Sequence, residues 1–174
     1  MNTGLPKTAC IGGRCFRIRS DFREILDICA ALNDPDLTDQ DRAEVAVKIF
    51  YPDWDQITDM AAAVKFMLWF LDGGVDRGDQ RQQPKQMDWE QDFPMIIAPI
   101  NRVAGQDVRA LPYMHWWTFI GYYMEIGDCT FSTILDIRRK AAQAQEAGKV
   151  GARILRRKPG IDRFQVGASD RRRR

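Results

Sequence analysis

Residues 60–71 read Met-Ala-Ala-Ala-Val-Lys-Phe-Met-Leu-Trp-Phe-Leu, and this stretch decides the fold class. Lys65 is its one charged residue, so a helix formed here is apolar around nearly its whole circumference. Helices of that kind are normally buried in a core. The stretch is too short for the roughly 20 residues that a membrane span needs. We therefore expect a helix over about 56–72, ended by Gly73-Gly74, at the centre of a helical domain.

Capping residues and apolar periodicity predict five further helices around this one. A capping residue precedes four of them: Asp21, Thr38, Asp88 and Thr130. Pro112 is placed at the first position of another, and Pro99 is expected to kink the helix that contains it. The five helices are expected at about 22–32, 39–50, 89–103, 112–124 and 130–147.

A β-hairpin is predicted over about Thr8–Arg19, because Gly12-Gly13 is a two-residue turn signal. In this register Cys10 lies opposite Cys15, as a non-hydrogen-bonded pair within reach of a disulfide. One face of the hairpin is apolar and the other polar, which indicates packing on a helical core. In a reducing cytosol we expect the two cysteines to be free thiols.

The charge of the chain is divided unevenly along its length. Residues 1–137 hold 13 Lys and Arg against 21 Asp and Glu, whereas residues 138–174 hold 13 against 3. We expect one compact, mainly α domain of about six helices over residues 1–147, with a mobile loop at about 74–86. Residues 148–174 are expected to form a basic tail, partly helical over 149–157 and then disordered. Such a tail attracts nucleic acid or an acidic protein surface, or serves as a solvated end.

Composition argues against catalysis, so we expect neither an enzyme nor a cofactor. His115 is the one histidine, and no phosphate-binding, nucleophile or zinc motif is present. Asp53, Asp55 and Asp59 cluster at a helix start, where capping explains them better than a metal site does. The first seven residues contain no apolar segment of a secretory signal. We expect a protein of the host cytoplasm with no membrane partner.

Two groups of residues are candidates for binding. The helix over 112–124 is rich in aromatic residues, which either form a platform for a partner or for stacked bases, or pack at the margin of the core. Its candidate residues are Tyr113, Trp116, Trp117, Phe119 and Tyr123. The second group is basic and suits nonspecific nucleic-acid contact or an acidic protein: Arg153, Arg156, Arg157, Lys158, Arg171, Arg172, Arg173 and Arg174.

Several motifs, in order, resemble a small phage and prophage family named for gene product fifteen. After the Gly-Gly hairpin come Ile-Arg-Ser-Asp-Phe-Arg at 18–23 and Phe-Tyr-Pro at 50–52, which leads to Phe-Met-Leu-Trp-Phe at 66–70. The others are Met-Asp-Trp-Glu-Gln-Asp at 87–92, His-Trp-Trp-Thr-Phe at 115–119 and Ser-Thr-Ile-Leu-Asp-Ile-Arg at 132–138. The resemblance covers about residues 5–140. Pro94 and Pro99 depart from the uninterrupted helix that it implies.

The resemblance implies a role in the assembly of long phage tails. Genes of this family usually lie between those for the major tail protein and the tape-measure protein, so it implies a chaperone that binds the tape-measure protein and possibly the major tail protein. It carries over no catalytic residues. Two other functions stay open: a nucleic-acid-binding accessory protein that uses the basic tail, and a minor structural protein of the virion.

Overall fold

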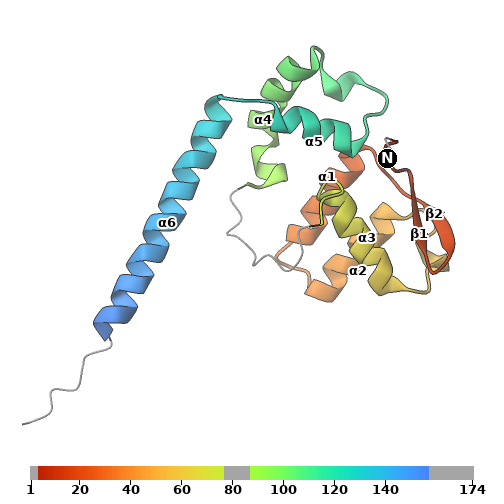
Figure 1. Ribbon diagram of the computed structural model, residues 1–174, viewed down its shortest axis with the longest axis horizontal. Coiled ribbons are helices and arrows are strands. Elements are labelled where there is room, and N and C mark those ends of the chain that lie inside the picture. The colour runs from red at the N-terminus through yellow and green to blue at the C-terminus, as the bar shows by residue number, and fades with distance from the viewer. Residues whose placement is uncertain (1–3, 77–86, 157–174) are drawn as a thin grey trace, which may run out of the picture.

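A hairpin and six α-helices make up the part of the chain that this computed structural model describes, residues 4–76 and 87–156 (Figure 1). The mainly helical fold with an N-terminal hairpin is therefore confirmed. Two short 3₁₀ turns join the helices. In chain order the elements are β1 (Thr8–Ile11), β2 (Arg14–Arg17), α1 (Phe22–Asn33), α2 (Asp39–Phe50), η1 (Trp54–Gln56), α3 (Met60–Leu71), α4 (Trp89–Ala104), η2 (Val108–Ala110), α5 (Trp116–Met124) and α6 (Thr130–Arg156).

The hairpin has the predicted register, with Cys10 opposite Cys15. Its apolar face is buried against the helices and its polar face is exposed. The prediction of two free thiols is wrong, because the structure joins Cys10 and Cys15 in a disulfide. The register brings their Cα atoms to 4.0 Å from each other, so the predicted disulfide reach is present and the bond is formed.

Predicted capping residues begin the first four helices. Asp21 accepts a hydrogen bond from the backbone N–H of Arg23, and Thr38 accepts one from Asp41. Asp88 accepts two, from the second and third residues of α4. Asp59 caps α3, so this helix begins at Met60 rather than near residue 56. Each side chain satisfies N–H groups that the helix itself leaves unpaired.

Helix α5 begins later than predicted, because tertiary pairing uses the residues in front of it. Phe22 donates its N–H to the carbonyl of Met114, and Trp116 donates to the carbonyl of Ser20. This short antiparallel bridge keeps the chain extended through His115, which then caps the helix. The proline signal at residue 112 is therefore overridden, and α5 begins at Trp116 instead.

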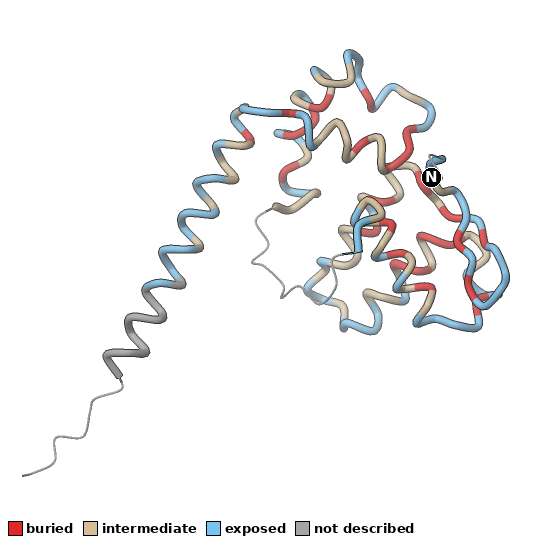
Figure 2. The backbone as a smooth tube through the Cα atoms, in the orientation of Figure 1, coloured by how far each residue is buried: buried red, intermediate tan, exposed pale blue. Residues whose placement is uncertain are grey.

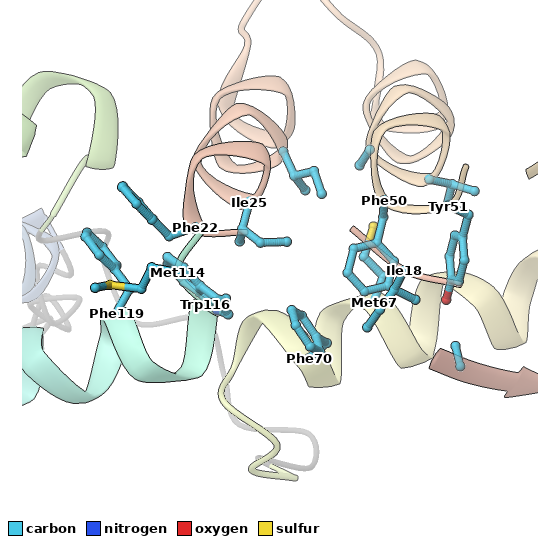
Figure 3. Close-up of a cluster of buried hydrophobic side chains, with 14 of the residues drawn as sticks. Ile18, Phe22, Ile25, Phe50, Tyr51, Met67, Phe70, Met114, Trp116 and Phe119 are labelled. Atoms are coloured by element: carbon cyan, nitrogen blue, oxygen red, sulfur yellow. The ribbon is translucent and has the colours of Figure 1, made fainter. Parts of the chain in front are cut away.

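Aromatic and aliphatic side chains from α1, α2, α3 and α5 meet in one core (Figure 3). Phe22 and Phe119 stack with ring centroids 4.4 Å apart. At the other end of the core, Tyr51 is buried and donates its hydroxyl hydrogen to the carbonyl of Ala63, 2.9 Å away. This bond links the end of α2 to α3.

Gly73 and Gly74 let α5 approach the end of α3 closely. Both have positive φ angles, 71° and 82°. A Cβ atom on Gly74 would lie 2.6 Å from the ring of Trp117. Two indole N–H groups reach the same place, since Trp116 donates to the carbonyl of Leu71 and Trp117 to that of Phe70. The predicted Gly-Gly helix end is therefore also the position where two halves of the chain dock.

Helix α6 extends away from the other helices (Figure 1), and most of the α6 residues whose burial is described are exposed (Figure 2). It runs as one helix from Thr130 to Arg156, past the predicted end near Ala147. Phe131 and Leu135 pack on the core, and Arg138 makes an ion pair with Asp92 of α4. The described contacts of α6 with the rest of the protein therefore lie in its first turns.

Two further predictions concern segments that are only partly covered. Of the predicted loop at about 74–86, residues 77–86 lie outside the described residues, and so does the tail from residue 157 onward.

Helix α4 continues through both Pro94 and Pro99. Among the described residues, no helix is both long enough and apolar enough to cross a membrane.

Candidate interaction surface

The aromatic residues of α5 are distributed between core and surface. Trp116 and Phe119 are buried, with exposed fractions of 2% and 0%. Trp117 is half-buried and packs on Phe70, with ring centroids 5.6 Å apart. Trp116 and Trp117 join α5 to the end of α3, and the rings of Trp116 and Phe119 also pack on Trp89 of α4. They offer little surface to a partner in this conformation.

The two tyrosines among the candidates lie apart and serve different contacts. Tyr113 precedes α5 and is 44% exposed, and its hydroxyl lies 2.8 Å from that of Ser20. Tyr123, near the end of α5, donates its hydroxyl hydrogen to the sulfur of Met87. The five predicted residues therefore do not form one aromatic platform, and binding through Tyr113 and Tyr123 stays a prediction.

His115 has a structural environment. Its side chain is 3% exposed, and Nδ1 accepts a hydrogen bond from the N–H of Trp117. Because Nδ1 accepts, Nε2 carries the proton and donates it to the carbonyl oxygen of Pro6, 2.9 Å away. Burial lowers the pKa of His115 below its ordinary value. The neutral ring thus caps α5 and fixes the N-terminal segment.

The outer face of α3 is the largest departure from the sequence analysis. This helix was expected to be buried all round, yet Leu68 is 45% exposed. Burial is confined to one side of the helix, at Ala63, Met67 and Phe70. The sequence does contain a signal for this: Ala61, Lys65, Leu68 and Asp72 follow one another at intervals of four, three and four residues, and all four are exposed. Because two of them are charged, this stripe marks the solvent side.

Two grooves flank the exposed side of α3. The first, which we call the hairpin groove, has a volume of about 510 Å³ and lies between α3, the hairpin and the segment after α3. It is lined by Cys10, Ala62, Lys65, Phe66, Leu68, Trp69, Asp72, Val75 and Asp76. The second, of about 560 Å³, lies between α2 and α3 and is lined by Gln40, Ala43, Glu44, Val47, Trp54, Met60, Ala61 and Val64. Most of these side chains are apolar, and several are large and exposed.

Acidic residues are frequent in the segment that carries this apolar surface. Between residues 53 and 76 the chain carries five aspartates and one basic residue, Lys65. Asp59 caps α3, and Asp53 lies 3.8 Å from Arg17, so the predicted capping role is confirmed for Asp59. In the described part of the chain, no group of three or more His, Cys, Asp and Glu side chains is placed to hold a metal ion.

Comparison with known proteins now identifies the family. The family model described as bacteriophage Gp15 protein matches residues 1–157. The chain belongs to this family. No curated protein and no solved structure matches the chain.

The basic candidates of this Gp15 family member lie in or beyond α6. Arg153 and Arg156 fall within the helix, but their side chains are not among those that the structure describes. Arg157, Lys158 and Arg171, Arg172, Arg173 and Arg174 lie outside the described residues. The basic part of the chain therefore follows a helix that leads away from the acidic surface of α3 (Figure 1).

Proposed function

We propose that this phage protein is a tail-assembly chaperone, not an enzyme, which binds the tape-measure protein in the host cytoplasm before or during assembly of the tail tube. The observation that carries the proposal is the exposed apolar surface of α3, with a groove on either side. Contiguous apolar surface of this kind is typical of sites that bind other proteins. The family membership supports a phage role, and the resemblance noted above supports tail assembly.

The physical requirements of a tape-measure protein fit such a surface. It is a long, largely helical chain that has to stay in solution until the tail tube closes around it. An amphipathic helix is commonly bound through its apolar face in an apolar groove. A chaperone with exposed grooves would cover these faces temporarily and release them during assembly.

Co-expression tests the proposal directly. The tape-measure protein of the same phage is produced alone, with this protein, and with an unrelated acidic helical protein as a control. We expect the soluble fraction of the tape-measure protein to rise with this protein and not with the control. An unchanged soluble fraction would contradict the proposal.

The composition of purified virions separates a chaperone from a minor structural protein. A chaperone leaves before the particle is complete, so mass spectrometry of purified particles should not detect this chain. Its presence at a fixed ratio to the major tail protein would favour the structural function instead.

Nucleic-acid binding is the second candidate, because residues 138–174 carry 13 basic residues against 3 acidic ones. Binding to phosphates releases counterions, so the affinity of the full-length protein for duplex DNA should then fall steeply with salt. A protein truncated after Ala147 should lose that binding, since the remaining chain is acidic. Negligible DNA binding at physiological salt would exclude this candidate.

A further inference from the structure

The chain consists of two parts of opposite charge. Residues 1–137 hold 13 Lys and Arg against 21 Asp and Glu, a net charge of −8, and residues 138–174 hold 13 against 3, a net charge of +10. Two copies that meet body to body, or tail to tail, place like charges against each other, which is repulsive. The complementary contact between two copies is heterologous, with the basic part of one on the acidic body of the other.

Helix α6 carries the start of the basic part away from its own body (Figure 1). Its described contacts with the rest of the protein end near Arg138, and residues 139–156 continue the same helix for about 27 Å. The outer part of α6 therefore lies beyond the reach of the grooves of its own chain, whereas the body of a second copy is open to it.

The outer part of α6 has an exposed apolar side with basic residues beside it. Ile137 is 61% exposed, and Ala141 and Ala144 follow it at spacings of four and three residues and are exposed as well. Arg139 and Lys140 are exposed next to this side. Residues 137–156 hold six basic residues against one acidic residue. An apolar groove in an acidic part of the surface complements both features.

Charge distinguishes the two grooves beside α3. The hairpin borders the first, and residues 4–19 carry four basic residues and no acidic ones. The second, which we call the α2–α3 groove, is lined by residues between 40 and 64, and residues 39–64 carry six acidic residues against two basic ones. Its lining includes Trp54 and Met60, which are 37% and 41% exposed. A basic helix is therefore favoured by the α2–α3 groove and disfavoured by the hairpin groove.

Three carboxylates beside the α2–α3 groove have no cationic partner among the described residues. Asp41 accepts a hydrogen bond from a hydroxyl group and Asp59 accepts one from a backbone N–H, both of which are uncharged. Asp55 is exposed, and no described cation pairs with it. Each of the three is next in the chain to a residue that lines the groove: Gln40, Trp54 or Met60.

We propose that the outer part of α6, residues 137–156, docks in the α2–α3 groove of a second copy, so that copies associate head to tail. The apolar side of α6 covers Trp54 and Met60, and its basic residues lie near Asp41, Asp55 and Asp59. Each contact leaves one groove and one helix free, so the association continues beyond two copies. This self-association goes beyond the proposed function and does not depend on it.

Sedimentation velocity of the full-length protein tests whether copies associate. The protein is treated with nuclease first, because nucleic acid could bridge the basic parts of several copies. At low ionic strength we expect the average mass to rise above that of one chain as the concentration increases. In roughly 1 M salt, where the Debye length is about 3 Å, single chains should predominate. A single chain at every concentration in low salt would overturn the proposal.

Matched variants locate the contact. Ala61→Arg adds a cation in the groove, and Ala98→Arg makes the same change at an exposed alanine of α4 outside it. Ala144→Glu reverses the charge preference on the docking side of α6, and Gln143→Glu adds the same charge about 100° around that helix. We expect Ala61→Arg and Ala144→Glu each to weaken self-association at least about tenfold and their controls to change it little. Equal effects of variant and control would contradict the proposed site.

Thermal melts establish that the variants are folded. Met60→Arg, at another exposed residue of the groove, replaces Ala61→Arg if the latter does not fold.

Mixing the two disruptive variants tests the head-to-tail arrangement. Ala61→Arg keeps an intact α6, and Ala144→Glu keeps an intact groove, so the equimolar mixture can form one productive contact. We expect each variant alone to sediment as a single chain and the mixture to form complexes of two chains and no larger ones. A symmetric interface contains both altered surfaces twice and would not be restored in this way. A mixture that contains single chains only would therefore overturn the proposal.

Discussion

Asp92 is completely buried, and Arg138 holds its carboxylate in the charged form. The two nitrogens of the guanidinium donate to the two carboxylate oxygens at 2.7 and 2.9 Å, and the N–H of Asp88 donates to one of them. Hydrogen bonding to Arg138 is the main reason why the pKa of Asp92 is lowered, although burial opposes it. This pair fixes the start of α6 to α4.

Replacement of Arg138 by Met should destabilise the protein markedly, because it leaves a buried carboxylate without its cation. We expect Tm to fall by about 5–10 °C. Arg139→Met is the control, because Arg139 pairs with an exposed carboxylate of its own helix and should change Tm little. The double variant Asp92→Asn, Arg138→Met should recover part of the loss. Equal Tm values for the two single variants would contradict this account.

His115 makes stability depend on pH near neutrality. Its folded pKa is lowered by burial, so the unfolded chain binds a proton at a pH where the folded protein does not. The stability that the neutral ring contributes is complete above the unfolded pKa of about 6.5 and is lost as the pH falls towards the folded pKa. Because the chain has one histidine, the free energy of unfolding should decrease between about pH 6.5 and 5 in the wild type. In His115→Asn, which keeps a capping side chain, urea titrations should show a smaller decrease in the free energy of unfolding over this pH range. An equal pH dependence of that free energy in the two proteins would exclude His115 as its cause.

At the scale of single elements, α3 has two faces with different tolerance for charge. Met67 is fully buried, whereas its neighbour Leu68 is 45% exposed. We expect Met67→Asp to unfold the protein, because a buried charge without a partner is very costly. Leu68→Asp should fold with a Tm close to that of the wild type. Circular dichroism melts measure both, and a Leu68→Asp protein that fails to fold would show that the outer face of α3 is covered.

The hairpin should lose stability when its disulfide is reduced. In the chain-entropy account, closing so short a loop between Cys10 and Cys15 contributes about 2 kcal/mol. Both cysteines are exposed, so a mild reductant reaches them. We expect reduction, or the double replacement Cys10→Ser and Cys15→Ser, to lower the free energy of unfolding by up to that amount. Cys129→Ser, which affects a thiol outside the disulfide, is the control. If reductant changes the wild type and the double variant equally, another group is responsible.

At the scale of the whole molecule, the structure indicates where the chain can be shortened. The described contacts between α6 and the rest of the protein end near Arg138. Truncation after Ala147 should therefore leave the thermal melt nearly unchanged. Truncation after Asp136 removes Arg138 and should lower Tm, as Arg138→Met does. A large loss of stability on truncation after Ala147 would show that the segment beyond it packs on the body.

Local sequence signals determined most of the elements. The capping residues Asp21, Thr38 and Asp88 and the Gly-Gly turn act within a few residues of themselves, so their effects could be predicted from the chain alone. The hairpin register followed from the same local geometry. The family also followed from the sequence, because ordered motifs are a property of the sequence itself.

Tertiary structure alone decided the start of α5, the environment of Asp92 and the exposure of α3. Met114 and Trp116 pair with residues that are distant in the chain, and Asp92 meets a cation 46 residues away. Leu68 faces solvent because α2, the hairpin and α5 cover α3 on one side and leave the other open. The hydrophobicity of a segment indicates how favourable its burial would be, but which side is buried depends on where the other elements pack.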